Sequence, residues 1–198
     1  MRGLIVDTTV KRAYAAAFDG EKTSVVYLAE GVSTASALIP AVRAALAELG
    51  LRNEELDGVS AVVGPGSFTG IRIGVSFINA FAFALSVPRF RITAFDVMRA
   101  VKEGAPAYGV DAGHDSYYAE FSTDEGYSDR NAASAEMPQG TFYQEDVAAD
   151  LPRGAITVLM RAIDQHVYSL CAPSYLTDLL TPYYMRKSQA ERMKEQHD

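Results

Sequence analysis

The sequence predicts an α/β protein built from layers of strands and helices. Two observations carry this prediction. Short β-prone runs alternate along the chain with longer tracts of helical period, and a glycine-rich turn joins a strongly apolar strand to a strongly apolar helix. The chain has 198 residues, 48% of them hydrophobic, which is enough to bury the core of one compact domain or two small ones.

The first hundred residues predict one layered unit. Asp19–Gly20 separates two β-prone runs and is typical of a hairpin turn. Leu38, Val42, Leu46 and Leu49 recur at helical spacing, and Gly50 follows them as a helix end. The expected elements are strands at 4–6, 14–18 and 24–28, a helix at 33–49, a strand at 59–63, a glycine-rich turn at 64–70, a helix at 71–86, a strand at 91–93 and a helix at 95–101.

A second, smaller unit is expected after a hinge at 104–106. Its predicted elements are strands at 107–111 and 116–121, a polar surface loop at 123–140, a short helix after a capping box at Thr141 and Gln144, a strand at 155–160, a helical tract at 161–180 broken by Pro173, and a charged tail at 186–198. We therefore expect an N-terminal domain over 1–103 and a smaller C-terminal domain over 104–198.

Charge and cysteine content narrow the function classes. The formal net charge is −7, which argues against a protein that holds RNA by itself, because RNA binding depends on clustered Lys and Arg. Cys171 is the only cysteine, so an internal disulfide is excluded and a cytoplasmic location is expected. The longest apolar stretch, around 71–85, contains Arg72 and Asn79 and is shorter than the roughly 20 residues of a membrane span.

The glycine-rich turn at 64–70 is the most informative segment. A loop of this kind, between a strand and a helix, exposes N–H groups that can bind an anion. It lacks the Gly-Lys-Ser/Thr ending of a P-loop and the glycine spacing of a dinucleotide site, and Ser67 lacks the flanking glycines of a nucleophile elbow. The residues alone favour a tight turn in which glycine is needed for the backbone conformation.

The helix after this turn is apolar on all sides, which predicts burial on all sides. Two explanations stay open at this stage. Either a second chain covers part of the two helices at 33–49 and 71–86, or the second half of the same chain does.

Catalytic and metal-binding constellations are not evident. The histidines, His114, His166 and His197, lie far apart in sequence and have no ligand spacing. Cys171 has no histidine at a sequence spacing that would indicate a catalytic or metal-binding pair, and it is expected in the core. We predict no catalytic residue and no metal site.

Residues 64–74, GPGSFTGIRIG, resemble the signature of the TsaB family almost position for position. The resemblance extends to LIVDTT at 4–9, to Leu38–Ile39–Pro40, to the hairpin at 110–119, and to Pro182-Tyr183-Tyr184-Met185-Arg186. It covers the first hundred residues well and the second half thinly. In the second half, Gly113 and His114 stand where the family usually has basic residues.

The resemblance implies an actin-like (ASKHA) fold of two RNase H-like domains, the second reduced. It also implies a non-catalytic scaffold that binds a TsaD-like catalytic subunit and works with a TsaE-like ATPase. That assembly threonylcarbamoylates an adenosine next to the tRNA anticodon, so tRNA is contacted through the complex, and the same surface allows a homodimer. The expected interface residues are Leu38, Val42, Leu46, Gly66, Phe68, Gly70, Ile71, Gly74, Ile78 and Phe81.

The resemblance also bears on nucleotide binding. Actin-like nucleotide-binding proteins have an Asp-x-Gly-Thr loop, and here Thr9 stands in place of the glycine. Asp7, Thr8 and Thr9 are the candidate cofactor contacts, although Asp7 is also typical of a residue that caps a turn. We expect no cofactor bound by this chain alone. Binding of ATP or ADP with Mg²⁺ at a junction between subunits stays open. The alternative function is a stand-alone actin-like ATPase or small-molecule kinase. A peptidase would require a base near Ser67, and the neighbouring sequence supplies none.

Overall fold

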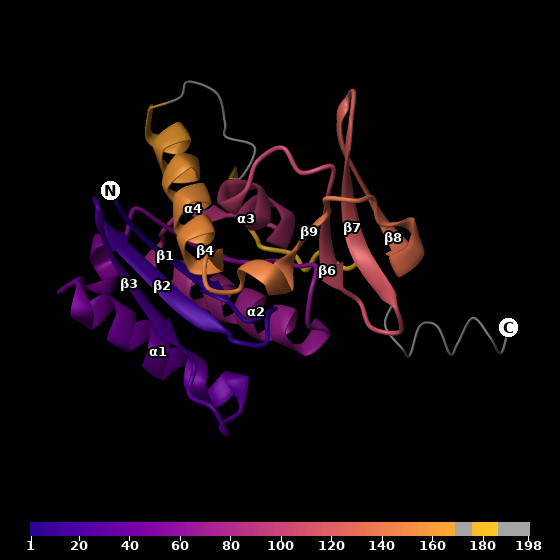
Figure 1. Cartoon of the computed structure of the whole chain (residues 1–198). Helices are drawn as coiled ribbons and strands as arrows, with labels where there is room; N and C mark the ends of the chain where they lie inside the picture. The colour runs from indigo at the N-terminus through magenta and orange to yellow at the C-terminus, as the bar shows by residue number, and fades with distance from the viewer. Residues whose placement is uncertain (169–175, 186–198) are drawn as a thin grey trace, which may run out of the picture.

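The computed structural model describes residues 1–168 and 176–185. Its strands form two sheets, which lie side by side in Figure 1. The larger sheet has the order β10-β5-β4-β1-β2-β3, and the smaller sheet has the order β8-β7-β6-β9. The mixed α/β class predicted from the sequence is confirmed.

The larger sheet begins with a meander. Strands β1 (Arg2–Asp7), β2 (Tyr14–Asp19) and β3 (Lys22–Tyr27) pair antiparallel in sequence order. β4 (Gly58–Ala61) then pairs parallel to β1 and β5 (Arg89–Phe90) parallel to β4, while β10 (Leu176–Thr177) pairs antiparallel to β5. The strands expected at 4–6, 14–18, 24–28 and 59–63 are therefore present. The strand expected at 91–93 is misplaced, because β5 ends at Phe90 and Ile92 forms only an isolated bridge with Val62.

Helices cover both faces of this sheet. α1 (Thr34–Glu48) and α2 (Phe68–Leu85) pack on one face, and α4 (Leu151–Tyr168) packs on the other. α3 (Ala94–Val101) lies against α4 and the smaller sheet. In Figure 1, α4 stands above the sheet and α1 below it.

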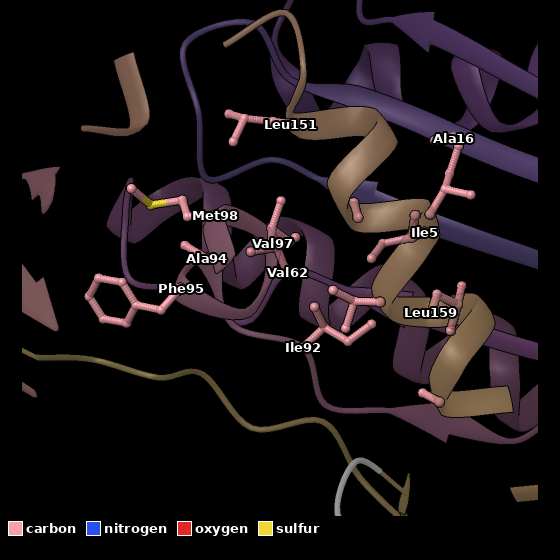
Figure 2. Packing of buried hydrophobic residues seen from close by; sticks show 14 of the residues in the cluster. Ile5, Ala16, Val62, Ile92, Ala94, Phe95, Val97, Met98, Leu151 and Leu159 are labelled. Carbon is pink, nitrogen blue, oxygen red and sulfur yellow. The ribbon is translucent and has the colours of Figure 1, made fainter. Parts of the chain in front are cut away.

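A sheet covered on both faces needs apolar side chains at consecutive positions. β1 meets this need: Leu4 and Val6 belong to the core under α1 and α2, whereas Ile5 belongs to the core under α4. All three side chains are fully buried. Figure 2 shows the second of these cores, with Leu159 of α4 beside Ile5 of the sheet and Leu151 at the start of the helix.

The smaller sheet contains β6 (Ala107–Asp111), β7 (Ser116–Thr123), β8 (Gly126–Ala133) and β9 (Phe142–Tyr143). Short 3-10 helices lie at Asn53–Glu55, Ser134–Glu136 and Gln144–Val147. Arg99 of α3 forms ion pairs with Asp96 on its own helix and with Glu120 of β7, and so ties the helix to the smaller sheet.

Two predictions for the second half are wrong. The expected polar loop at 123–140 contains strand β8, which pairs with β7 along its whole length. Nearly all of β8 is exposed, so it lacks the apolar alternation that marks a strand. The expected strand at 155–160 lies inside α4, whose apolar run faces both α3 and the larger sheet and therefore shows no helical stripe.

Smaller differences concern the caps and the end of the chain. Thr141 does not cap a helix: its hydroxyl donates to the carbonyl of Pro138, and the 3-10 helix begins at Gln144. The predicted helical tract at 161–180 continues as α4 to Tyr168, but Leu176–Thr177 forms a strand. Pro173 and the predicted tail at 186–198 lie outside the described residues.

The expected division into 1–103 and 104–198 stays a prediction. The smaller sheet does begin after residue 104, but the chain then returns to the larger sheet through α4 and β10. Helix α2 has the length and apolar composition of a membrane span, yet its inner side packs on the larger sheet, as in the core helix of a globular protein.

Candidate functional site

The glycine-rich turn connects β4 to α2 and lies beside the end of β1. Ser67 caps α2 by accepting a hydrogen bond from the N–H of Gly70 at 3.2 Å. The N–H of Ser67 itself donates to the carbonyl of Thr9 at 2.9 Å. Two of the N–H groups that a phosphate would need are thus bonded within the chain.

Close backbone approach explains the glycines of this turn. Gly64 has a φ of 118°, and a Cβ there would lie 2.5 Å from the carbonyl oxygen of Tyr183. A Cβ at Gly70 would lie 1.8 Å from the carbonyl oxygen of Thr8. The turn is therefore packed between the end of β1 and the segment around Tyr183, which agrees with the structural interpretation that the residues favoured.

Asp7, Thr8 and Thr9 are buried, with 1%, 3% and 5% of their surface exposed. One oxygen of Asp7 accepts hydrogen bonds from the backbone N–H and the hydroxyl of Thr9, at 2.9 and 2.7 Å. The hydroxyl of Thr8 donates to the carbonyl of Gly70 at 2.6 Å. These partners occupy the groups that were the candidate cofactor contacts, so the three residues hold the end of β1 together.

Burial also changes the titration of this cluster. It raises the pKa of Asp7 above the ordinary value of 3.8, and the hydrogen bonds from Thr9 oppose the rise. Tyr14 lies opposite Asp7 in the β1–β2 pairing, and burial beside this carboxyl raises the pKa of its hydroxyl well above 10.0. A carboxyl so enclosed is a poor Mg²⁺ ligand, because Mg²⁺ retains several waters when it binds to proteins.

The residues near the chain end form a strap along α2, comprising Leu176–Met185. The side-chain amide of Asn79 bonds to Leu180 twice, donating to its carbonyl and accepting from its N–H, both at 2.9 Å. The ring of Tyr184 packs on Phe68 with 4.7 Å between centroids. The sequence contains the Pro182–Arg186 motif but gives no sign that it lies against the glycine turn.

Metal ligands do not gather in the described part of the chain, where no group of three or more His, Cys, Asp and Glu side chains could hold an ion. His114 lies in the β6–β7 turn with a φ of 55° and is exposed. The ring of His166 packs edge-on against Phe90. Cys171 and His197 lie outside the described residues.

Comparison with known proteins decides the family. A family model described as TsaD, tRNA N6-adenosine threonylcarbamoyltransferase, matches residues 32–135, more than half of the chain. The chain is also 32% identical, over 96 residues, to the tRNA threonylcarbamoyladenosine biosynthesis protein TsaB of Haemophilus influenzae. The chain is a TsaB-like member of the TsaD family.

The alignments to curated relatives cover only part of each relative. The alignment to H. influenzae TsaB covers 48% of this chain and 40% of TsaB. A second alignment, to the uncharacterized protein ML0378 of Mycobacterium leprae, is 33% identical and covers 60% of this chain and 34% of that protein. The chain thus spans less than half of the length of these curated relatives.

Solved structures support the fold. YeaZ from Pseudomonas aeruginosa aligns with a TM-score of 0.57 at 24% identity, covering 69% of each chain. A structure described as an uncharacterized protein with similarity to peptidase YeaZ from P. aeruginosa aligns with a TM-score of 0.68 at 19% identity, covering 93% of this chain and 99% of that one. The predicted actin-like fold of this family is confirmed.

Most of the predicted interface residues of this TsaB-like chain are buried within the chain itself, and their contact with a partner stays a prediction. Leu38, Val42, Leu46, Ile71 and Ile78 are at most 3% exposed and form the core between the two helices and the larger sheet. Gly66, Gly70 and Gly74 pack against Thr8 and Thr9. Of the ten residues, Gly66, Phe68 and Phe81 are partly exposed, and Phe68 packs against Tyr184 of the strap.

The exposed apolar surface of α1 and α2 lies on the outward side of the helices. Phe83 is 81% exposed, Ile39 is 49% exposed, and Val32 before α1 is 53% exposed. Phe77 and Phe81 are partly buried and pack on each other with 5.5 Å between ring centroids. Phe83 lies on a different side of α2 from Phe77 and Phe81, in a hollow that it shares with Leu176 and Thr177 of the strap. We use the name outward face for the four apolar residues Ile39, Phe77, Phe81 and Phe83 taken together.

Helical periodicity identifies the side of a helix that is buried in its own chain, and Leu38, Val42 and Leu46 lie on that side of α1. Exposed apolar surface has a different sequence feature, which is a large apolar residue at a position where a surface helix would have a charged one.

Proposed function

We propose that this chain is a non-catalytic scaffold subunit that binds a TsaD-like catalytic protein through the outward face of α1 and α2. In this proposal the assembly threonylcarbamoylates an adenosine next to the tRNA anticodon, with a TsaE-like ATPase as a further member. The observation that carries it is the exposure of Phe83 and Ile39 on two helices that pack beside each other.

The chemistry of the outward face favours a protein partner. Aromatic residues are enriched at protein interfaces, and a side chain such as Phe83 gains most when a partner covers it fully. An interface of standard size buries about 800 Å² on each chain. At about 25 cal/mol per Å² of apolar surface, this is ample to offset the entropy of association.

The family relationship favours a homologous partner. The family model is named for TsaD, and a TsaD-family relative, the tRNA N6-adenosine threonylcarbamoyltransferase of Chlorobium luteolum, is 37% identical to this chain over 51 residues. Two homologous chains carry corresponding helices, so a pair of them can pack face to face with pseudo-twofold symmetry. The same geometry allows a homodimer when the TsaD-like protein is absent.

The acidic charge supports a role in which another subunit contacts RNA. A net charge of −7 opposes binding to phosphates, and we propose that tRNA is reached only through the complex, in the cytoplasm. The involvement of ATP or ADP with Mg²⁺ at a subunit junction stays a prediction. Because Asp7, Thr8 and Thr9 are engaged with one another and with Gly70, such a nucleotide would contact other residues.

The test is the mass of the full chain in solution, alone and mixed with the TsaD-like protein encoded in the same genome. We expect a homodimer that is replaced by a one-to-one heterodimer on mixing. The variant Phe83→Glu should remain folded, since the side chain is exposed, and should lose both assemblies. A chain that stays monomeric with and without the TsaD-like protein would refute the proposal.

A further inference from the structure

A cavity of about 410 Å³ lies between the two sheets, beside the glycine turn. Five segments line it: the β1–β2 loop, the glycine turn before α2, the end of β6, the 3-10 helix at Gln144–Val147, and the start of α4. Its volume falls in the range of small-molecule sites. None of the outward-face residues lines it, so it is separate from the proposed partner surface.

Gln144 supplies a polar group that the chain itself does not satisfy. Its side chain is only 9% exposed and lines the cavity. Within the described residues its side-chain amide makes no hydrogen bond to the protein, and solvent in the cavity reaches it, since it is not one of the fully enclosed polar atoms. A ligand in the cavity would provide a hydrogen-bond partner for this amide.

Charges of opposite sign line the two sides of the cavity. Lys11 and Arg12 come from the larger sheet, whereas Asp111 and Glu145 come from the smaller one. None of the four takes part in an ion pair within the described residues, so each sign remains available across the cavity. Arg12 lies over the ring of Tyr27, 4.2 Å from its centroid, which leaves Lys11 as the cation without another contact.

The remaining wall is apolar and includes Val10, Val110 and Leu151. This combination suits a molecule that carries both charges and a small hydrophobic group. It does not suit a polyphosphate, because Asp111 and Glu145 would repel the negative charge and the nearby Thr9 hydroxyl already donates to Asp7.

We infer that this cavity binds a small zwitterion with a carboxylate and an ammonium group, which is the chemistry of free amino acids and dipeptides. The carboxylate lies toward Lys11 and Arg12, and the ammonium lies toward Asp111 and Glu145. The amide of Gln144 bonds to a polar group of the ligand, and the apolar wall receives its side chain. The inference does not depend on the proposed function, since it uses none of the outward-face residues.

Calorimetric titration of the full chain tests the inference with a panel of the common L-amino acids and a set of dipeptides, and with ATP and AMP as comparisons. We expect saturable binding of at least one amino acid or dipeptide. Comparison of the titrations with amino acids and with dipeptides shows which of the two classes the cavity binds. Binding of nucleotides alone, or no saturable binding by any member of the panel, would overturn the inference.

Variants then locate the site. Gln144→Leu, Lys11→Ala and Glu145→Gln should each weaken binding about tenfold or more, because each removes a hydrogen bond or a charge that the ligand uses. The matched controls Gln165→Leu, Lys22→Ala and Glu125→Gln change exposed residues away from the cavity and should leave the affinity unchanged.

Circular dichroism confirms that each variant is folded before titration. Should Gln144→Leu fail to fold, the two charge variants still decide the matter, since Lys11 and Glu145 are exposed. Equal affinity in the charge variants and their controls would place the ligand elsewhere and overturn the assignment.

Discussion

Replacing Gly70 by alanine tests how α2 is seated on the end of β1. Gly70 lies in the first turn of α2, and alanine there would favour the helix by about 0.5–1 kcal/mol on intrinsic propensity. The structure predicts the opposite sign. A Cβ at this position would lie 1.8 Å from the carbonyl oxygen of Thr8, far inside the 3.4–4 Å of ordinary contact.

The obstacle is backbone, so it cannot move aside as a flexible side chain would. Relief requires a shift of α2 or of the β1 end, which also disturbs the hydrogen bond from the Thr8 hydroxyl to the Gly70 carbonyl. Overpacking of this kind costs about 1–3 kcal/mol and sometimes more. After subtraction of the helix propensity, we expect a net loss of about 1–2 kcal/mol in the free energy of unfolding.

Urea denaturation followed by circular dichroism measures this loss, with Ser76→Ala on the exposed side of α2 as the control. The control should change the stability by less than about 0.5 kcal/mol. The reasoning can be refined with Gly74→Ala, whose Cβ would meet the Thr8 hydroxyl oxygen at 2.5 Å. Thr8→Ala should partly rescue Gly74→Ala but not Gly70→Ala. If Gly70→Ala were as stable as the wild type, the close contact of α2 with β1 would be refuted.

Three further predictions concern buried polar groups. Because burial raises the pKa of Asp7 in the folded chain, its carboxyl ionises first in the unfolded chain, so the stability should fall as pH rises above about 3.8 toward the folded pKa. Asp7→Asn should remove this fall, which thermal unfolding from pH 4 to 8 would show; an unchanged profile would contradict it. Arg99→Ala leaves Glu120 buried without its cation and should cost about 3 kcal/mol in urea unfolding, whereas the exposed Arg153→Ala should cost little. Asn79→Ala removes both bonds to Leu180, so limited proteolysis should cut the strap faster than in the wild type, and equal rates would count against the strap.

The first half of the fold could be predicted because its signals are local. The Asp19–Gly20 turn marks the β2–β3 hairpin, and the spacing of Leu38, Val42 and Leu46 marks α1. The second half lacked such signals. β8 is an exposed, polar edge strand and therefore lacks the alternation of apolar and polar residues that marks a strand. α4 is covered on two sides and therefore lacks the single apolar stripe that marks a surface helix.

The candidate site was less accessible to sequence reasoning, since it depends on contacts between distant segments. Asp7 ends a strand in the sequence, but only the fold shows that one of its oxygens accepts two hydrogen bonds from Thr9. The residues expected at the interface lie mostly on the buried side of α1 and α2, whereas Ile39 and Phe83 are exposed, and only the fold distinguishes the two sides. Gln144 gives no local sign of its burial, because the cavity that it lines forms between two sheets.

The affinity of the TsaD-like protein for the wild-type chain and for two single variants tests the central proposal most directly. Phe83→Glu places a charge on the outward face, whereas Val25→Glu places the same charge on β3, whose Val25 is also exposed and faces away from α1. We expect tight binding by the wild type and by Val25→Glu, and a loss of at least about tenfold for Phe83→Glu. Equal affinity for all three chains would contradict the assignment of the outward face as the partner surface.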